Sequence, residues 1–154
     1  MKKMTENEAL LRLSAMCASA EHCSYEMTEK MRKWELPDDA AARVMERLVN
    51  DKYIDDERYS RFFVKDKLRY NKWGRRKIDQ ALFMKRIPED IRQAVLSEIT
   101  DEAYAGILRP LLKSKRKATK AASDYEMNGK LIRFAMSRGF DMDVIRMCMD
   151  CDTE

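Results

Sequence analysis

The sequence predicts an all-α fold: an elongated, curved array of three tandem repeats, each made of three helices. Four glycines and three prolines in 154 residues leave little material for the turns of a β-sandwich or barrel. Apolar residues make up 45% of the chain and charged residues 38%, a mixture typical of amphipathic helices. The apolar pattern also restarts twice, at offsets of 51 and 53 residues. A single globule of about nine helices is the alternative that these observations leave open.

The first repeat, residues 5–52, contains three segments whose apolar residues recur at helical spacing. Ser24 is a suitable N-cap for the second helix. Pro37 suits the first position of the third helix, and the two aspartates that follow it complement the helix dipole. The three apolar faces are formed by Leu10, Leu11, Leu13, Met16 and Cys17, by Met27, Met31 and Trp34, and by Ala41, Val44, Met45, Leu48 and Val49.

The second repeat, residues 53–100, follows the same order. Asp55 and Asp56 open its first helix, Gly74 opens the second and Pro88 opens the third. When residues 36–39 are placed over residues 87–90, apolar residues coincide at every position compared. The coinciding pairs are Met27 and Ile78, Met31 and Leu82, Val44 and Val95, and Leu48 and Ile99.

The third repeat, residues 101–152, differs at its helix ends. Gly139 is expected to end the second helix with a positive φ. Its equivalents are Glu35 and Arg86, for which a positive φ is costly, so we expect the prolines that follow them to end those helices. Pro110 should kink the first helix or mark its true start. Apolar periodicity lapses over residues 114–123, which predicts an irregular segment where proteases cut first.

Positive charge is concentrated in two stretches, although the net charge is only +4. Such stretches indicate contact with nucleic acid or with an acidic protein groove, and a solvated helix face is the alternative. Trp73 lies among these cations with Tyr70, a mixture that suits base stacking beside phosphate contacts. Trp73 could equally wedge between two repeats. The candidate binding residues are Lys65, Lys67, Arg69, Lys72, Trp73, Arg75, Arg76 and Lys77 in the first stretch, and Lys113, Lys115, Arg116, Lys117 and Lys120 in the second, which begins at Arg109.

The remaining motifs do not predict catalysis. Cys148 and Cys151 form a C-x-x-C, but it follows a predicted helix near the C-terminus instead of opening one, and small apolar packing residues are the favoured interpretation. A zinc site that also used Cys17, His22 and Cys23 would lack a standard spacing. No P-loop, dinucleotide fingerprint or activated-serine motif is present. We therefore expect no catalytic residue, cofactor or metal.

The sequence also carries no apolar run long enough for a membrane span, and the first residues lack the apolar region of a signal peptide. We accordingly expect a cytoplasmic monomer whose four cysteines are reduced thiols and which has no membrane partner.

The segment from Leu48 to Tyr59, LVNDKYIDDERY, resembles the RecX family of recombination regulators. Its continuation through Phe62-Phe63-Val64 to the Gly-Arg-Arg-Lys-Ile at 74–78 extends the likeness, and residues 130–140 are similar to the family's last repeat. The resemblance covers about residues 5–152. Glu35 and Arg86 depart from the glycine usual in the family, and Pro110 is a further departure.

The resemblance implies a three-repeat helical protein that binds RecA recombinase filaments, lies in the filament groove and inhibits their ATPase and strand-exchange activities. Such a protein would modulate DNA repair and recombination, and single- or double-stranded DNA is a further implied partner. A sequence-nonspecific DNA-binding protein is the alternative that the basic stretches support by themselves. The segment from Asp55 to Arg58 is expected to be structural, with an aspartate as N-cap.

Overall fold

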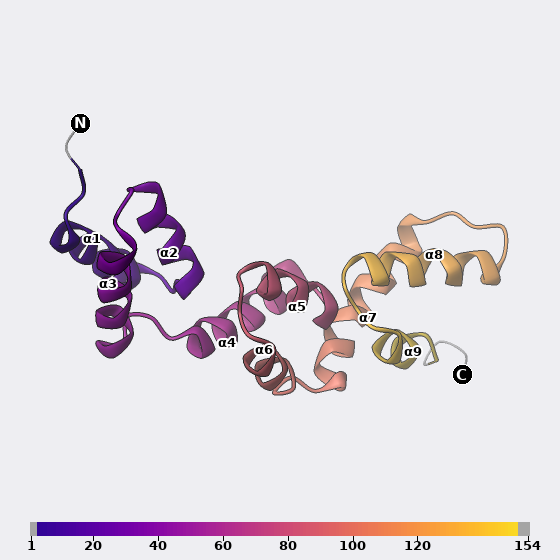
Figure 1. Cartoon of the computed structure of the whole chain (residues 1–154). Coiled ribbons are helices and arrows are strands. Elements are labelled where there is room, and N and C mark those ends of the chain that lie inside the picture. The colour runs from indigo at the N-terminus through magenta and orange to yellow at the C-terminus, as the bar shows by residue number, and fades with distance from the viewer. Residues whose placement is uncertain (1–2, 151–154) are drawn as a thin grey trace.

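The structure, a computed structural model, describes residues 3–150, and every regular element within that range is helical. Figure 1 shows the helices arranged as a row of three units, with the two termini at opposite ends. No described helix is long and apolar enough to cross a membrane. The elements are α1 (Glu6–Ser19), α2 (Ser24–Lys33), α3 (Asp38–Asn50), α4 (Asp56–Asp66), the π-helical η1 (Lys67–Asn71), α5 (Arg75–Met84), α6 (Glu89–Leu96), α7 (Asp101–Ala118), α8 (Asp124–Ser137) and α9 (Met142–Asp150).

Three apolar cores follow one another along the row, so the prediction of an all-α helical repeat fold is confirmed. The first core holds buried residues between Ala9 and Ile54, and the third holds residues between Tyr104 and Cys148. The second core lies between them, and it takes in Cys23 from the start of α2. Leu68 and Ile99 pack against both the second and the third core. Neighbouring units therefore share apolar side chains at their joints.

For α2 to α6, the helix begins within one residue of the predicted position. Asp55 is the N-cap of α4 as expected, because its Oδ1 accepts the Arg58 amide at 3.0 Å. The N-cap of α2 is Cys23 instead of Ser24, and the Cys23 amide donates to Glu26 Oε1 at 3.1 Å. Pro37 is also an N-cap and not the first helical residue, because its ψ of 147° is extended.

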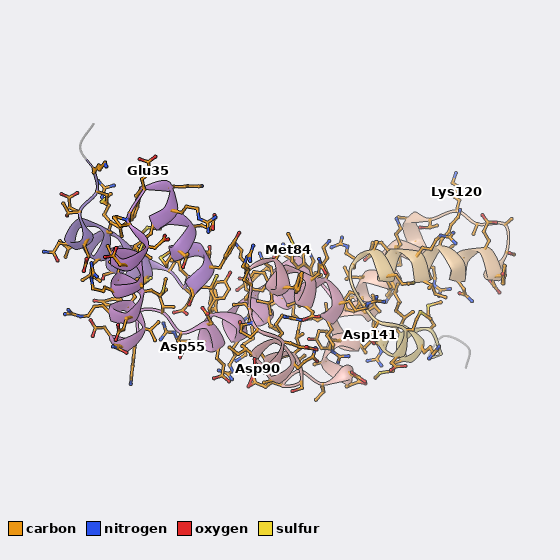
Figure 2. The ribbon with its side chains drawn as sticks, viewed as in Figure 1. Glu35, Asp55, Met84, Asp90, Lys120 and Asp141 are labelled. Atoms are coloured by element: carbon orange, nitrogen blue, oxygen red, sulfur yellow. The ribbon has the colours of Figure 1, made fainter. Side chains whose placement is uncertain are left out.

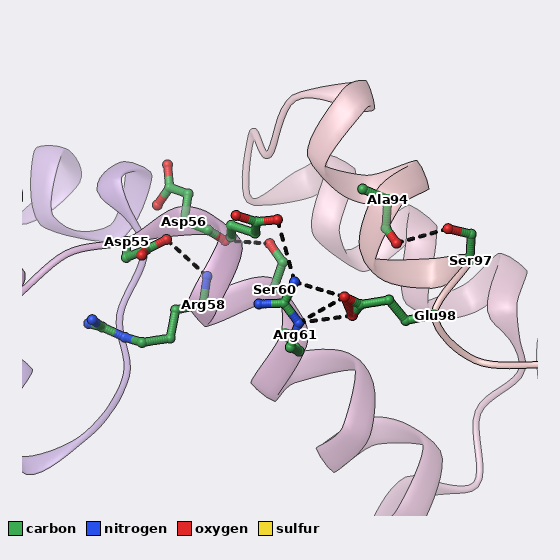
Figure 3. Close-up of polar contacts among 9 residues, drawn as sticks. Asp55, Asp56, Arg58, Ser60, Arg61, Ala94, Ser97 and Glu98 are labelled. Atoms are coloured by element: carbon green, nitrogen blue, oxygen red, sulfur yellow. Dashed lines mark hydrogen bonds and ion pairs between the residues drawn. The ribbon is translucent and has the colours of Figure 1, made fainter.

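Residues of α4 beyond the Asp55 cap make polar contacts within their own unit. The Arg61 guanidinium binds Glu98 (Figure 3), with a shortest distance of 2.8 Å, and it also lies 3.4 Å from Glu57. Because Glu98 follows α6, this contact ties α4 to the end of the third helix of its own unit.

The expectation that prolines end α2 and α5 was wrong. Glu35 and Arg86 have φ values of 57° and 59°, so they take the same left-handed role as Gly139 at 92°. Each of these helix ends is a Schellman motif, in which the next residue turns its amide back to the last helical turn and its side chain into the core. Burial of that apolar side chain offsets the cost of about 1 kcal/mol for a positive φ. The buried side chains are Leu36, Ile87 and Phe140, whose amides donate to the carbonyls of Met31, Leu82 and Ala135.

Helix α7 is longer than the sequence predicted. It runs without a break through Pro110 and continues to Ala118, so Pro110 does not mark its start and the segment 114–118 is helical. Its inner face buries Tyr104, Leu108 and Leu112, which shows why the helix persists. Tertiary packing outweighs the loss of the hydrogen bond that proline cannot donate.

The joint between the first two units is made by side chains. The Ser24 amide donates to Asp56 Oδ1 at 2.8 Å, so the start of α2 meets the start of α4. Lys85 Nζ lies 3.6 Å from Glu26 Oε2 on α2. The turn that ends α5 is thus held against α2 by polar side chains.

The joint between the second and third units uses the equivalent elements and adds direct contact between backbones. The Gly74 amide donates to the Arg138 carbonyl at 2.8 Å, and the Arg76 amide donates to the Gly139 carbonyl at 2.9 Å. A Cβ atom on Gly74 would collide with the backbone of Gly139 and Phe140. Glycine is therefore required at residue 74 because two backbones touch there.

Candidate anion-binding surface

Helix α8 connects the first basic stretch to the third unit. Arg138 Nη1, at the end of α8, donates to the Asn71 carbonyl at 3.3 Å. The Lys77 side chain lies against the Gly139 turn, and its ammonium is 4.9 Å from the centre of the Trp73 ring. The cations of residues 72–77 therefore border the C-terminal end of α8.

The same helix also contacts the second basic stretch. The Lys115 ammonium is 5.1 Å from the centre of the Phe134 ring, and the Arg138 guanidinium is 5.4 Å from the same ring. Lys130 Nζ donates to the Lys120 carbonyl at 2.8 Å. The loop that carries Lys120 is visible at the far end of the third unit in Figure 2.

A continuous series of cations results, and we call Lys77, Arg138, Arg133, Lys115 and Lys130 the basic band. A groove of about 390 Å³ lies within it, and the groove is lined by Lys115, Thr119, Lys130, Arg133, Phe134 and Ser137. Lys130 pairs with Glu126 at 3.2 Å, and the pKa of Glu126 is lowered by the Ala122 amide and by Lys130. Within residues 3–150 the other four cations of the band form no ion pair, so their charge is available to an anionic partner.

Most of the predicted binding residues are exposed. The exposed cations are Lys65, Arg69, Lys72, Arg76, Lys77, Lys113, Lys115, Lys117 and Lys120. Arg116 is partly buried on α7. Lys67 is also partly buried, because its ammonium lies 5.4 Å from the ring centres of both Phe63 and Trp73. Trp73 is partly buried against the second core, with the Lys67 and Lys77 ammonium groups near its ring, and its role in base stacking stays a prediction.

Arg75 does not lie with the exposed cations, because it is held by two acidic residues of the third unit. Its guanidinium pairs with Asp141 at 2.9 Å and with Asp101 at 2.5 Å. It also covers the Tyr104 ring, with its central carbon 4.6 Å from the ring centre. Arg75 therefore fixes the third unit against the second.

Sequence reasoning missed the contribution of α8, namely Lys130, Arg133, Phe134 and Arg138. These residues are spread over a helix that also carries acids, so no dense basic run marks them. Their spacing places them on one face of a helix, and that is the signal that could have found them.

The cysteines are placed in or near cores. Cys148 is 4% exposed, and its thiol donates to the Ala105 carbonyl at 3.6 Å. Burial raises the pKa of the Cys23 thiol to about 11, which disfavours the reactive thiolate. Among the described residues no group of three or more His, Cys, Asp or Glu side chains could hold a metal ion. Cys151 lies outside the described residues.

Comparison with known proteins agrees with the arrangement of units. The family model for the second three-helix domain of RecX matches residues 55–96, and the model for the third matches residues 102–149. A crystal structure of RecX from Lactobacillus salivarius superimposes with a TM-score of 0.86 at 18% identity and covers 94% of both chains.

Curated relatives carry the name "Regulatory protein RecX". The protein from Lactobacillus delbrueckii subsp. bulgaricus is 34% identical over 116 residues, which is 73% of this chain and 43% of that relative. The protein from Chlorobium limicola is 28% identical over 148 residues, which is 95% of this chain and 90% of that relative. The chain spans about half the length of the first of these curated relatives. With two RecX domain models matching in order on a fold of the same architecture, the chain belongs to the RecX family of regulatory proteins.

Proposed function

We propose that this chain binds filaments of the RecA recombinase and inhibits their ATPase and strand-exchange activities, and that it thereby modulates DNA repair and recombination. The observation that carries the proposal is the basic band, because α8 joins two distant basic stretches into one surface of an elongated RecX-family protein. A nucleoprotein filament offers acidic protein surface and phosphates in a regular array. Such a partner matches a cationic surface that extends over two repeats.

The row of units supports binding to a periodic partner. Each unit presents a separate surface, so successive units can contact successive subunits of a filament. Contacts that are weak singly add through the effective concentration that the first contact creates. A monomer of this chain is sufficient for such binding, and no catalytic group is needed to block turnover by the filament.

The direct test measures binding and ATP hydrolysis together. The protein is mixed with RecA filaments assembled on single-stranded DNA, and co-sedimentation and DNA-dependent ATP hydrolysis are followed as its concentration rises. We expect co-sedimentation and a parallel fall in ATP hydrolysis. Full ATPase activity at saturating protein, or no co-sedimentation, would contradict the proposal.

Charge reversal locates the contact surface. The double variants Arg76→Glu with Lys77→Glu, and Lys115→Glu with Lys117→Glu, change exposed side chains at the two ends of the band. Each should weaken filament binding and leave helicity unchanged. A matched control is Lys30→Glu with Lys33→Glu on α2, because these lysines are exposed on the first unit, away from the band. Equal binding by all three variants would remove the band from the mechanism.

Sequence-nonspecific DNA binding is the second candidate, and the same cations favour it. Loss of each phosphate contact should reduce the slope of log affinity against log salt by about 1. If DNA binding alone explains inhibition, competitor duplex restores ATP hydrolysis fully, and inhibition is lost at the salt concentration that abolishes binding to bare DNA. If the filament is the partner, inhibition persists at that salt concentration.

A further inference from the structure

A groove of about 500 Å³ lies at the joint between the first and second units, away from the basic band. It is lined by Tyr25, Phe83, Met84, Arg86, Ile87 and Arg92. Figure 2 labels Met84 on the central unit, where α5 ends. The lining thus combines the start of α2 with the α5–α6 turn and α6.

Arg86 explains why this joint has an open groove. Its equivalent in the third unit is Gly139, which lets the turn touch the backbone of α5. At residue 86 the turn keeps a positive φ of 59° but carries a long side chain, whose guanidinium lies 5.2 Å from the centre of the Tyr25 ring. The turn and α2 are therefore bridged by side chains, and space remains between them. Arginine therefore occupies a position with a positive φ, which costs conformational free energy for every residue except glycine.

The groove presents apolar surface beside a cation. Phe83 is 58% exposed and Met84 is 64% exposed, and the two are adjacent in the chain. The neighbouring carboxylates already have partners, since Glu26 pairs with Lys85 at 3.6 Å and Asp79 pairs with Arg92 at 2.8 Å. Among the described residues Arg86 forms no ion pair. The groove therefore offers an aromatic and thioether wall with one unmatched positive charge.

We propose that this groove binds a peptide segment of a partner protein, in which a large apolar side chain is flanked by carboxylates. Aromatic residues, Met and Arg are the residues enriched at the centre of protein interfaces, and Arg86 supplies the matching charge. Nucleic acid fits less well, because one unpaired cation on an apolar wall offers a phosphate chain few contacts. The inference depends on the proposed function in one respect: it takes the filament as the partner that supplies the peptide segment.

The test uses a defined probe and the full chain. The probe is a fluorescein-labelled peptide with a leucine–phenylalanine pair between two runs of three glutamates. Two matched peptides replace the glutamates by lysines or the leucine–phenylalanine pair by serines. Fluorescence anisotropy should show saturable binding of the first peptide, and each matched peptide should bind at least tenfold more weakly.

Variants then assign the binding to the groove. Arg86→Gly removes the cation at a positive φ that suits glycine, so the fold is retained, and circular dichroism checks this. It should weaken peptide binding about fivefold to tenfold, as loss of a charge-assisted contact does. Phe83→Ser, at an exposed position, should weaken it similarly. The control Lys33→Glu, an exposed lysine at the far end of α2, should leave peptide affinity unchanged.

The outcomes separate this inference from the proposed function. No saturable binding, equal affinity for the glutamate and lysine peptides, or unchanged affinity in Arg86→Gly overturns the groove as a peptide site. A single-stranded oligonucleotide that displaces the glutamate peptide from the wild-type chain also overturns it. If filaments co-sediment while the peptide fails to bind, only the groove proposal falls. If the peptide binds selectively while filaments do not co-sediment, only the proposed function falls.

Discussion

At the scale of single residues, charge alone does not distinguish a binding side chain from a structural one. Arg75 and Arg76 are neighbours in the sequence, yet Arg76 is exposed and Arg75 joins two units. The difference arises from Asp141, which lies 66 residues further along the chain. No local pattern in the sequence contains that contact, so the sequence placed both arginines in one basic stretch.

Replacing Arg75 should therefore destabilise the fold, whereas replacing Arg76 should not. Arg75→Ala leaves the partly buried Asp141 and the exposed Asp101 without their cation and uncovers Tyr104. We expect the free energy of unfolding to fall by about 1–3 kcal/mol. Arg76→Ala, the matched control, should change it by less than about 0.5 kcal/mol. Urea titration followed by circular dichroism measures both, and equal midpoints for the two variants would refute the structural role of Arg75.

The glycines give a second prediction with an internal control. Gly139→Ala forces a Cβ atom into the Lys77 side chain and backbone at a φ of 92°, so we expect a loss of about 2 kcal/mol or more. Gly106→Ala places its Cβ in open space within α7, where alanine is the better helix former, so it should gain up to about 1 kcal/mol. Thermal unfolding distinguishes the two, and a stabilised Gly139→Ala variant would contradict the tight backbone joint.

At the scale of elements, local chemistry predicted helix starts better than helix ends. N-caps and first-turn acids are short-range signals, so the N-cap of α4 was narrowed to Asp55 or Asp56, and Pro37 was misplaced by only one residue. The ends of α2 and α5 depend on an apolar side chain that is buried by other helices. The identity of Glu35 or Arg86 does not reveal that burial. The preference of glycine for a positive φ, used alone, therefore predicted wrongly how α2 and α5 end.

Helix α7 supplies the prediction at this scale. Residues 114–118 are helical, and the irregular segment begins at Thr119. Trypsin needs a locally unfolded substrate, so cleavage after Lys120 should precede cleavage after Lys113 and Lys115. Limited digestion with mass spectrometry of the early fragments gives the order. First cuts at Lys113 or Lys115 would show that the end of α7 is not a stable helix.

At the scale of the whole molecule, repetition was visible in the sequence, but the way in which the repeats join was not. The offsets of 51 and 53 residues predicted three units, and three successive cores follow that period. The two joints use equivalent elements with different chemistry: side-chain contacts in the first, and touching backbones together with the Arg75 ion pairs in the second. The candidate surface depends on the second joint, because the contacts of Arg138 and Gly139 bring α8 to the first basic stretch. That placement brings the scattered cations of α8 next to the first basic stretch, so that together they form one candidate binding surface.

The row of units predicts a size in solution that a single globule would not have. A compact chain of this length should have a radius of gyration of about 15 Å. Here each unit packs only on its neighbours and the termini lie at opposite ends, so small-angle scattering should give a clearly larger value. The joint between the second and third units is closed by backbone contacts, so Lys85→Ala, which loosens only the first joint, should alter the scattering profile more than Arg76→Ala does. A radius near 15 Å for the wild-type chain would mean that the first unit folds back on the others, and the exposed groove beside Arg86 would then be covered.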